Sequence, residues 1–223
     1  MSFRLKIKHY LIHRLNYTNK LAGELISSGN LTVNGKNIVS NIELKESDEV
    51  HLNGVIVKHS VKFVYYALYK PIGIESVFDK KRVDSLYKIW PVEGEFYVAG
   101  RLDKASEGLL IITNNGKWVN EVTSDLSLKE KDYEVEVEHD IDGGFLKKMS
   151  EGVDIGICIT KPCRIQMINN RAFKITLTEG KNRQIRRMCK KFGYSVIRLK
   201  RIRIDKFYLL DLKPFEYREV FLT

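Results

Sequence analysis

The chemistry that this sequence can support is indicated first by a run of basic side chains. Ten basic residues and no acidic one lie between residues 181 and 203. Without these ten, the 38 Lys and Arg residues of the 223-residue chain fall to 28, which equals its number of Asp and Glu residues. A surface that only keeps a protein dissolved would mix both signs of charge, so we interpret the run as a phosphate-binding surface. The ten residues are Lys181, Arg183, Arg186, Arg187, Lys190, Lys191, Arg198, Lys200, Arg201 and Arg203.

A second group with chemical potential is the carboxylate of Asp103, which stands between Arg101 and Lys104. A Gly-x-x-Asp segment such as Gly100–Asp103 is common in turns, so its spacing alone does not separate a catalytic carboxylate from a turn residue. A carboxylate that attacks a substrate must stay ionised, and a nearby guanidinium favours the charged form. The basic run contains several guanidinium groups that could supply this charge.

The elements that must position the basic run follow from the spacing of its apolar residues. Within 182–192 the apolar residues recur on one helix face, and Gly193 follows as a stop signal. From Val196 onward apolar and basic residues alternate as in a strand, and the apolar register slips at Ile202, which predicts a bulge. We expect this helix and this strand to form one continuous positive wall. The apolar helix residues are Ile185, Met188, Cys189 and Phe192.

The whole chain reads as an α+β protein with two parts. Residues 1–58 form a small module, with helices predicted over 3–14 and 20–27, short strands over 31–33 and 48–52, and a tight turn at Asn34-Gly35. Residues 61–223 show longer strands, predicted over 61–69, 109–113, 133–138 and 173–178, and helices over 117–123 and 141–150. The Val and Glu residues that alternate within 133–138 are typical of a sheet with one face in water.

The composition is that of a globular protein, with 43% hydrophobic residues, 15 Gly and 4 Pro. Apolar runs fall short of the roughly 20 residues that cross a bilayer, and residues 1–8 carry charge without an apolar signal segment. The three cysteines, Cys158, Cys163 and Cys189, are odd in number and lack CxxC spacing, so neither a disulfide framework nor a metal site is expected. We therefore expect a cytoplasmic protein with no membrane contact.

Four segments stand along the chain in an order that resembles the RsuA-type ribosomal RNA pseudouridine synthases. They are Lys70-Pro71-Ile72-Gly73; Gly100-Arg101-Leu102-Asp103-Lys104, continuing through Ser106-Glu107-Gly108-Leu109-Leu110 to Thr113-Asn114-Asn115-Gly116; Lys131-Asp132-Tyr133-Glu134-Val135; and Glu179-Gly180-Lys181-Asn182-Arg183-Gln184-Ile185-Arg186-Arg187-Met188. The last segment is most similar to the RluF and RluB branches, which modify large-subunit rRNA. Residues 1–58, with Gly29-Asn30-Leu31-Thr32-Val33-Asn34-Gly35, resemble the S4 RNA-binding module of such enzymes.

Two positions depart from the family pattern. Thr18-Asn19-Lys20 stands where the S4 pattern usually has a Ser-Arg pair, and Tyr69 precedes Lys70 where an Asn is usual. The first departure bears on the affinity or the target of the S4 module, and neither touches the reaction.

The resemblance implies an S4 module joined to a catalytic domain with a mixed, largely antiparallel sheet. It implies that Asp103 is the nucleophile, that the Arg186 guanidinium keeps it ionised, and that Tyr133 packs on the target base and transfers a proton. Lys70-Pro71 is expected to be an architectural turn. The reaction needs no cofactor and no metal, and we expect a monomer whose partner is ribosomal RNA. The expected RNA contacts are Arg101, Lys104, Asn182, Arg183, Gln184, Arg187, Lys200, Arg201 and Arg203.

Other functions remain open at this level. A non-catalytic RNA-binding protein of ribosome assembly would share the basic run but would not need Asp103 and Tyr133. An S4-fused RNA methyltransferase would need a glycine-rich cofactor loop, which the sequence lacks. A DNA-binding helix-turn-helix protein is disfavoured by the many predicted strands. Large-subunit rRNA is the predicted substrate, with small-subunit rRNA or a tRNA loop as the alternatives, and the exact uridine is not readable from the sequence.

Overall fold

The computed structural model describes residues 5–124 and 128–222. Its internal contacts divide the chain into two compact units, Met1–Phe63 and Val64–Thr223. The sequence places this division between residues 58 and 61, a few residues earlier. Each unit has a hydrophobic core of its own, one of residues between Ile7 and Leu52 and one of residues between Leu68 and Leu199.

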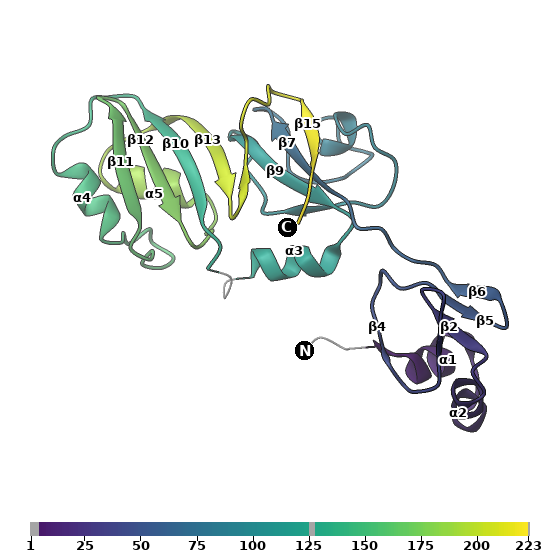
Figure 1. Ribbon diagram of the computed structural model, residues 1–223. Helices are drawn as coiled ribbons and strands as arrows, with labels where there is room; N and C mark the ends of the chain where they lie inside the picture. The colour runs from purple at the N-terminus through teal and green to yellow at the C-terminus, as the bar shows by residue number, and fades with distance from the viewer. Residues whose placement is uncertain (1–4, 125–127, 223) are drawn as a thin grey trace. The chain divides into compact units, whose positions relative to one another are not determined.

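The first unit pairs two short helices with short antiparallel strands (Figure 1). The helices are α1 (Ile7–Leu15) and α2 (Asn19–Ser27). A four-stranded sheet has the order β3-β2-β5-β6, and β1 pairs with β4. The strands are β1 (Leu5–Lys6), β2 (Leu31–Val33), β3 (Lys36–Ile38), β4 (Glu43–Leu44), β5 (Val50–Leu52) and β6 (Val55–Lys58).

The helix predicted over 3–14 begins later than expected. Leu5 and Lys6 are extended and pair with Leu44 and Glu43, so α1 begins at Ile7. Residues 3 and 4 of that prediction lie outside the described residues. The second helix agrees with the sequence, and its Thr18 hydroxyl accepts a hydrogen bond from the Leu21 amide at 3.2 Å, as expected of an N-cap.

The described part of the second unit is built on a nine-stranded sheet whose main order is β11-β12-β10-β13-β9-β7-β15. Among its described strand pairs, β9 and β13 are parallel and the others are antiparallel, which confirms the mixed, largely antiparallel sheet. The strands are β7 (Tyr65–Lys70), β8 (Tyr97–Ala99), β9 (Glu107–Thr113), β10 (Lys131–Val137), β11 (Arg164–Asn169), β12 (Ala172–Leu177), β13 (Val196–Ile204), β14 (Phe207–Tyr208) and β15 (Tyr217–Val220).

Three α-helices accompany this sheet in the described residues: α3 (Gly116–Thr123), α4 (Phe145–Ser150) and α5 (Gln184–Lys191). A short 3-10 turn spans Leu86–Lys88. The helix predicted over 141–150 begins at Phe145, because the Asp142 carboxylate accepts hydrogen bonds from the Gly144 and Phe145 amides, each at 2.8 Å, and so caps the helix there. None of the described helices is long and apolar enough to cross a membrane.

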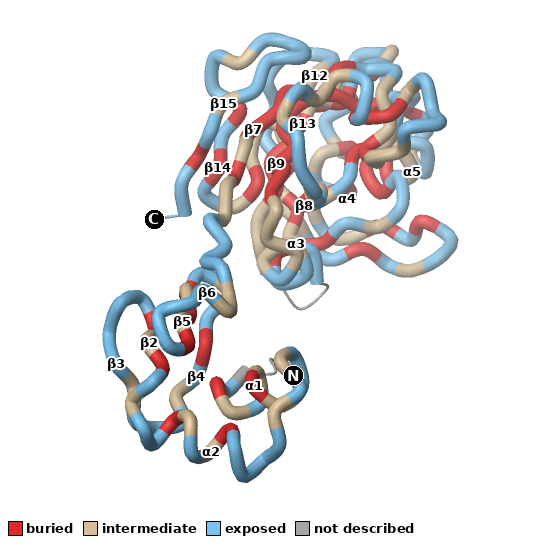
Figure 2. The backbone as a smooth tube through the Cα atoms, turned by 90° about the vertical axis from the view of Figure 1, so that its right-hand side faces the viewer, coloured by how far each residue is buried: buried red, intermediate tan, exposed pale blue. Residues whose placement is uncertain are grey.

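The sheet has one covered face and one open face along β10. Tyr133, Val135 and Val137 are buried, whereas Glu134 and Glu136 are only partly buried, as the alternation predicts. Apolar residues of α4 and α5 join the same core as the covered face, among them Phe145 and Met188. The long buried stretch of β9 runs through this unit (Figure 2). Residues on the two faces of β13 therefore have very different surroundings.

The bulge predicted in β13 is confirmed. Arg201 pairs with Tyr133 and Arg203 pairs with Asp132, so Ile202 is the extra residue between them. The bulge keeps Arg201 on the covered face and turns Arg203 to the open face. At the same point β13 meets β9, where Arg201 pairs with Gly108.

Candidate active site

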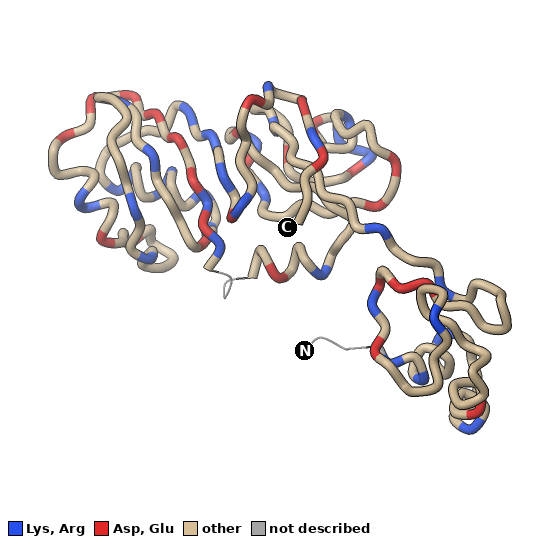
Figure 3. Tube along the Cα trace, in the orientation of Figure 1, with Lys and Arg blue, Asp and Glu red and all other residues tan. Residues whose placement is uncertain are grey.

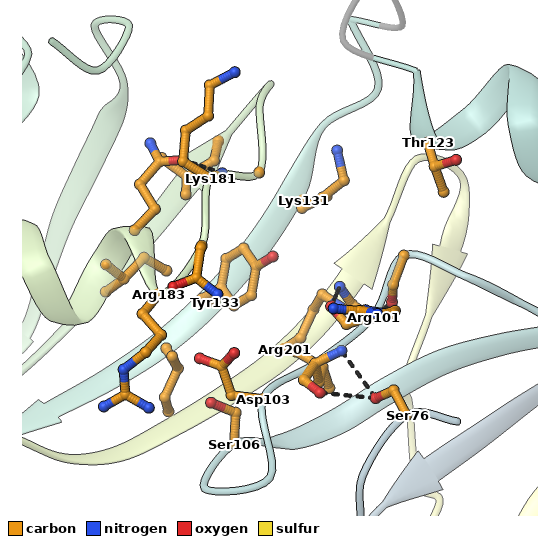
Figure 4. A pocket seen from close by; sticks show the side chains of 18 of the residues that line it. Ser76, Arg101, Asp103, Ser106, Thr123, Lys131, Tyr133, Lys181, Arg183 and Arg201 are labelled. Atoms are coloured by element: carbon orange, nitrogen blue, oxygen red, sulfur yellow. Dashed lines mark hydrogen bonds between the residues drawn. The ribbon is translucent and has the colours of Figure 1, made fainter. Parts of the chain in front are cut away.

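A cavity of about 710 Å³ opens in the second unit beside the contact of β9 and β13. It is lined by strand residues of β10 and β13, by the loop 100–106, by the segment 177–185 and by residues 75–77. These regions lie far apart in the sequence, and each contains one of the motifs or its direct continuation. Figure 4 shows their side chains converging, with Asp103 beside Tyr133 and the two flanked by Arg183 and Arg101.

Asp103 lies on the loop between β8 and β9, as expected, and its side chain is half-buried in the cavity. Neighbouring groups hold the backbone of this loop. The Ser76 hydroxyl donates to the Leu102 carbonyl at 2.8 Å and accepts from the Leu102 amide at 3.0 Å. The Asp103 carbonyl accepts from the Ser106 amide at 3.0 Å, and the Lys104 carbonyl accepts from the Gly73 amide at 2.9 Å. The carboxylate is therefore presented by a rigid turn.

Tyr133 of β10 lines the same cavity and is 8% exposed. Its partner on β13 is Arg201, which lines the same cavity. The ring and its hydroxyl thus present to the cavity both an apolar surface and a polar group.

Arg186 does not line the cavity, but its guanidinium contacts the backbone of the Asp103 loop. Its guanidinium donates to the Ala105 carbonyl at 2.8 Å, to the Val196 carbonyl at 2.9 Å and to the Ser106 hydroxyl at 3.4 Å. Burial and the nearby Arg183 lower the pKa of Arg186, while the charge of Asp103 opposes this. Within the described residues no ion pair within 4.0 Å joins Arg186 to Asp103, so its role as the counter-ion stays a prediction.

Lys70 is a second cation that interacts electrostatically with Asp103. Its side chain is fully buried. Its ammonium group donates to the Pro71 carbonyl at 2.8 Å and to the Ile74 carbonyl at 2.7 Å. Burial, helped by the charge of Arg201, lowers the pKa of Lys70 to about 8, while Asp103 and Glu107 oppose the shift. Sequence reasoning treated this segment as a turn, which agrees with its hydrogen bonds, but missed that a titratable amine lies beside the nucleophile candidate.

The loop that leads into α5 brings two of its predicted RNA contacts to the surface and buries the third. Asn182 and Arg183 are exposed and line the cavity. Gln184 is 4% exposed, and its amide accepts from the Lys181 amide at 3.0 Å and donates to the Glu179 carboxylate at 2.9 Å. The prediction that Gln184 donates to phosphates is therefore corrected, because both ends of its amide are used to shape this loop.

The positive wall predicted from the basic run forms on α5 but not on β13. Arg183, Lys190 and Lys191 are exposed, and Arg187 is half-buried. Basic positions of β13 lie next to acidic positions of the neighbouring strand β10 (Figure 3). The pairs and their distances are Arg198–Glu107 at 2.6 Å, Lys200–Glu134 at 3.8 Å, Arg203–Glu130 at 2.6 Å and Arg203–Asp132 at 2.9 Å.

The predicted phosphate contacts on β13 are thus corrected for a physical reason. Lys200 and Arg203 lie on the open face of the sheet, opposite the face that carries the cavity, and carboxylates neutralise them. Arg201 lies on the cavity face but is 1% exposed, and its guanidinium donates to backbone carbonyls. Residues on the neighbouring strands determine whether each of these basic side chains is neutralised, buried or exposed. A count of charges along the sequence carries no information about these neighbours.

Arg101 and Lys104 are exposed at the rim of the cavity, as predicted. Lys104 forms an ion pair with Asp84 at 2.7 Å, and Asp84 also accepts from Arg82. Sequence reasoning missed Ser76, whose only signal is its position just after the Lys-Pro-x-Gly turn. Among the described residues, no group of three or more His, Cys, Asp or Glu side chains is placed to hold a metal ion.

Comparison with known proteins adds the chemistry to this geometry. Residues 64–191 match the family described as RNA pseudouridylate synthase. The chain is 34% identical to the dual-specificity RNA pseudouridine synthase RluF of Escherichia coli, over 97% of this chain and 75% of that protein. It is 30% identical to the ribosomal small subunit pseudouridine synthase A of Yersinia pestis, over 96% and 94%.

Two further comparisons agree. The chain is 29% identical to the ribosomal large subunit pseudouridine synthase B of Bacillus subtilis, over 93% of this chain and 87% of that protein. A crystal structure of a pseudouridylate synthase superposes with a TM-score of 0.68 at 24% identity, covering 97% of this chain and 96% of the other. This last likeness supports the fold.

Proposed function

The chain belongs to the RNA pseudouridylate synthase family and is an RNA pseudouridine synthase, and we propose that its substrate is one uridine of large-subunit ribosomal RNA. The reaction is an isomerisation. The C1′–N1 bond of the uridine breaks, the uracil turns, and a C1′–C5 bond forms, while C5 loses a proton and N1 gains one. No group is added to the RNA and none is lost.

The observation that carries the proposal is the meeting of Asp103 and Tyr133 in one cavity beside an exposed basic loop. In the proposed mechanism Asp103 attacks the substrate as an ionised carboxylate. Arg186, which donates to the Ala105 carbonyl and the Ser106 hydroxyl of the same loop, is its proposed counter-ion. Tyr133 packs on the uracil ring and assists the proton transfer that ends the isomerisation.

The target uridine must leave its stack to reach this cavity, which costs a few kcal/mol. We infer that phosphates on either side of it are held by the exposed basic groups that line the cavity, Arg101 and Arg183, together with Asn182. We therefore restrict the proposed phosphate contacts to residues at the rim of the cavity and on α5. Lys200 and Arg203 take no part, since they lie on the other face of the sheet.

The large-subunit target rests on the segment Glu179–Met188, which resembles the RluF and RluB branches. A small-subunit target is the second candidate, because a relative named for the small subunit is about as similar as one named for the large subunit. The test is to incubate the purified enzyme with large-subunit rRNA, small-subunit rRNA and bulk tRNA, and to map pseudouridine in each. Mapping in cells with and without the protein identifies the uridine. Modification of small-subunit rRNA or tRNA alone would refute the large-subunit target.

We also propose that the first unit binds RNA as an S4 module and that the protein acts as a cytoplasmic monomer. In support of RNA binding, α1 exposes His9, His13 and Arg14. Arg14→Glu should weaken RNA binding, whereas the same change at Arg171, in the β11–β12 turn, should not. Equal effects of the two changes would contradict the S4 assignment, and sedimentation as a dimer would contradict the monomer.

A further inference from the structure

Arg201 is a buried cation without a carboxylate partner. Of the side chains that the structure describes, it is the largest that is fully buried, with 1% of its surface exposed. No ion pair within 4.0 Å joins it to a carboxylate in residues 5–124 and 128–222, whereas Arg203, two residues further on the same strand, contacts both Asp132 and Glu130. A buried charge lowers the free energy of unfolding unless other groups compensate it, so its presence here needs an explanation.

The compensation comes from groups that belong to the active site. The Arg201 guanidinium donates to the Gly100 carbonyl at 2.5 Å, to the Leu109 carbonyl at 2.8 Å and to the Arg101 carbonyl at 3.5 Å. Two of these carbonyls lie just before Asp103 and one lies after it, in β9. One rigid planar group therefore holds both sides of the Asp103 loop.

We propose that Arg201 is a positioning residue for the isomerisation, which fixes the backbone of the loop on both sides of Asp103. This inference rests on the proposed role of Asp103. Only the fork of a guanidinium offers five donors in a fixed plane, whereas a lysine amine offers three on a flexible stem. A misplacement of reacting groups by about 1 Å is enough to slow a reaction roughly 100-fold.

A lysine at this position would carry one amine on a flexible stem, so it would reach the carbonyl on one side of the Asp103 loop but not the carbonyls on both sides at once.

The test compares Arg201→Lys with Arg203→Lys. Both changes keep the charge and lie on the same strand, but Arg203 is on the face opposite the cavity. With an rRNA fragment that the wild-type enzyme modifies, we expect Arg201→Lys to lower kcat about 100-fold with KM for RNA within about twofold. Arg203→Lys should keep kcat within about threefold, even where it lowers the thermal midpoint by as much as Arg201→Lys does.

A kcat of Arg201→Lys within threefold of wild type, or a change in KM alone, would overturn the proposal. If neither Arg201→Lys nor Arg201→Gln folds, Arg201 supports only the sheet, and the proposal is equally overturned.

The outcome is distinguishable from a failure of the proposed function. If Asp103→Asn keeps wild-type activity, the proposed site itself is wrong. If Asp103→Asn is inactive and Arg201→Lys behaves as wild type, the site stands and the positioning role of Arg201 falls.

Discussion

Replacing Gly108 by alanine should separate β9 from β13 and so disturb the floor of the cavity. Gly108 has a φ of +108°, a conformation that L side chains rarely adopt, and an added Cβ would overlap the Arg201 carbonyl oxygen and lie 2.7 Å from the Arg201 amide nitrogen. Both obstacles are backbone atoms, so no change of rotamer relieves the overlap. The parallel contact of the two strands consists of the pairs Lys200–Glu107 and Arg201–Gly108. The substitution disrupts the second pair.

The expected loss of stability has two parts. Backbone strain at such a φ costs about 1–3 kcal/mol, and forcing extra volume into a packed region costs about 1–3 kcal/mol. We therefore expect Gly108→Ala to lower the free energy of unfolding by about 3–5 kcal/mol. At about 2–4 °C per kcal/mol for a chain of this size, the thermal midpoint should fall by roughly 10 °C.

Two other glycines serve as matched controls, because they separate the two parts. Gly156 has a φ of +85° with nothing within 4 Å of an added Cβ, so Gly156→Ala carries only the backbone strain, about 1–2 kcal/mol. Gly143 has neither a positive φ nor a neighbour within 4 Å, and Gly143→Ala should stay within about 0.5 kcal/mol of wild type.

Thermal unfolding followed by tryptophan fluorescence is a suitable assay, since Trp90 and Trp118 both belong to the second unit. Measured below its midpoint, Gly108→Ala should also show reduced turnover, because Arg201 and the Asp103 loop lie on the two displaced strands. A Gly108→Ala protein that is no less stable than Gly156→Ala would show that the strands accommodate the Cβ. The steric argument would then be wrong.

Four further outcomes are expected. Asp103→Asn should keep RNA binding and lose pseudouridine formation in a single-turnover assay, because the amide carries no charge with which to attack. Tyr133→Phe keeps the ring and loses only the hydroxyl, so slow turnover should accompany unchanged binding of the rRNA fragment. Arg183→Glu with Arg187→Glu should weaken binding and flatten the slope of log K against log salt by about 1.4, at about 0.7 per phosphate contact. For Lys70, whose folded pKa of about 8 lies below its ordinary 10.5, the unfolded chain binds the extra proton between these values, so its contribution to the free energy of unfolding should rise from pH 8 to pH 10.5.

Three of these outcomes have a control or a refuting result. Asp103→Asn activity within tenfold of wild type, a change below about 1.4 kcal/mol in the barrier, would rule out the nucleophile. Arg171→Glu, a single charge reversal on an exposed turn, should leave the salt slope unchanged. The Lys70→Met variant has no titratable group at this position. The free energy of urea unfolding of the wild type should therefore rise relative to that of this variant from pH 7.5 through pH 8.5 to pH 9.5. A constant difference would mean that Lys70 keeps its ordinary pKa.

Sequence reasoning succeeded where the decisive neighbours are close in the chain. The helix α5 follows from the spacing of Ile185, Met188 and Cys189, which all lie within two turns and are all buried. The bulge at Ile202 follows from a slip in the local alternation. The four motifs also identify the loop, the strand and the helix that surround the cavity, because each motif is a contiguous segment.

The tertiary structure alone decided which basic residues are available to RNA. In sequence, Lys200, Arg201 and Arg203 continue the run that begins in α5, and nothing local separates them from it. Their partners belong to strands 65 to 100 residues earlier, and strand order and register bring those partners alongside. Electrostatic energy depends on distance in space, so the same charge becomes a surface contact on α5, half of an ion pair on the open face of β13, or, at Arg201, a buried group held by backbone carbonyls.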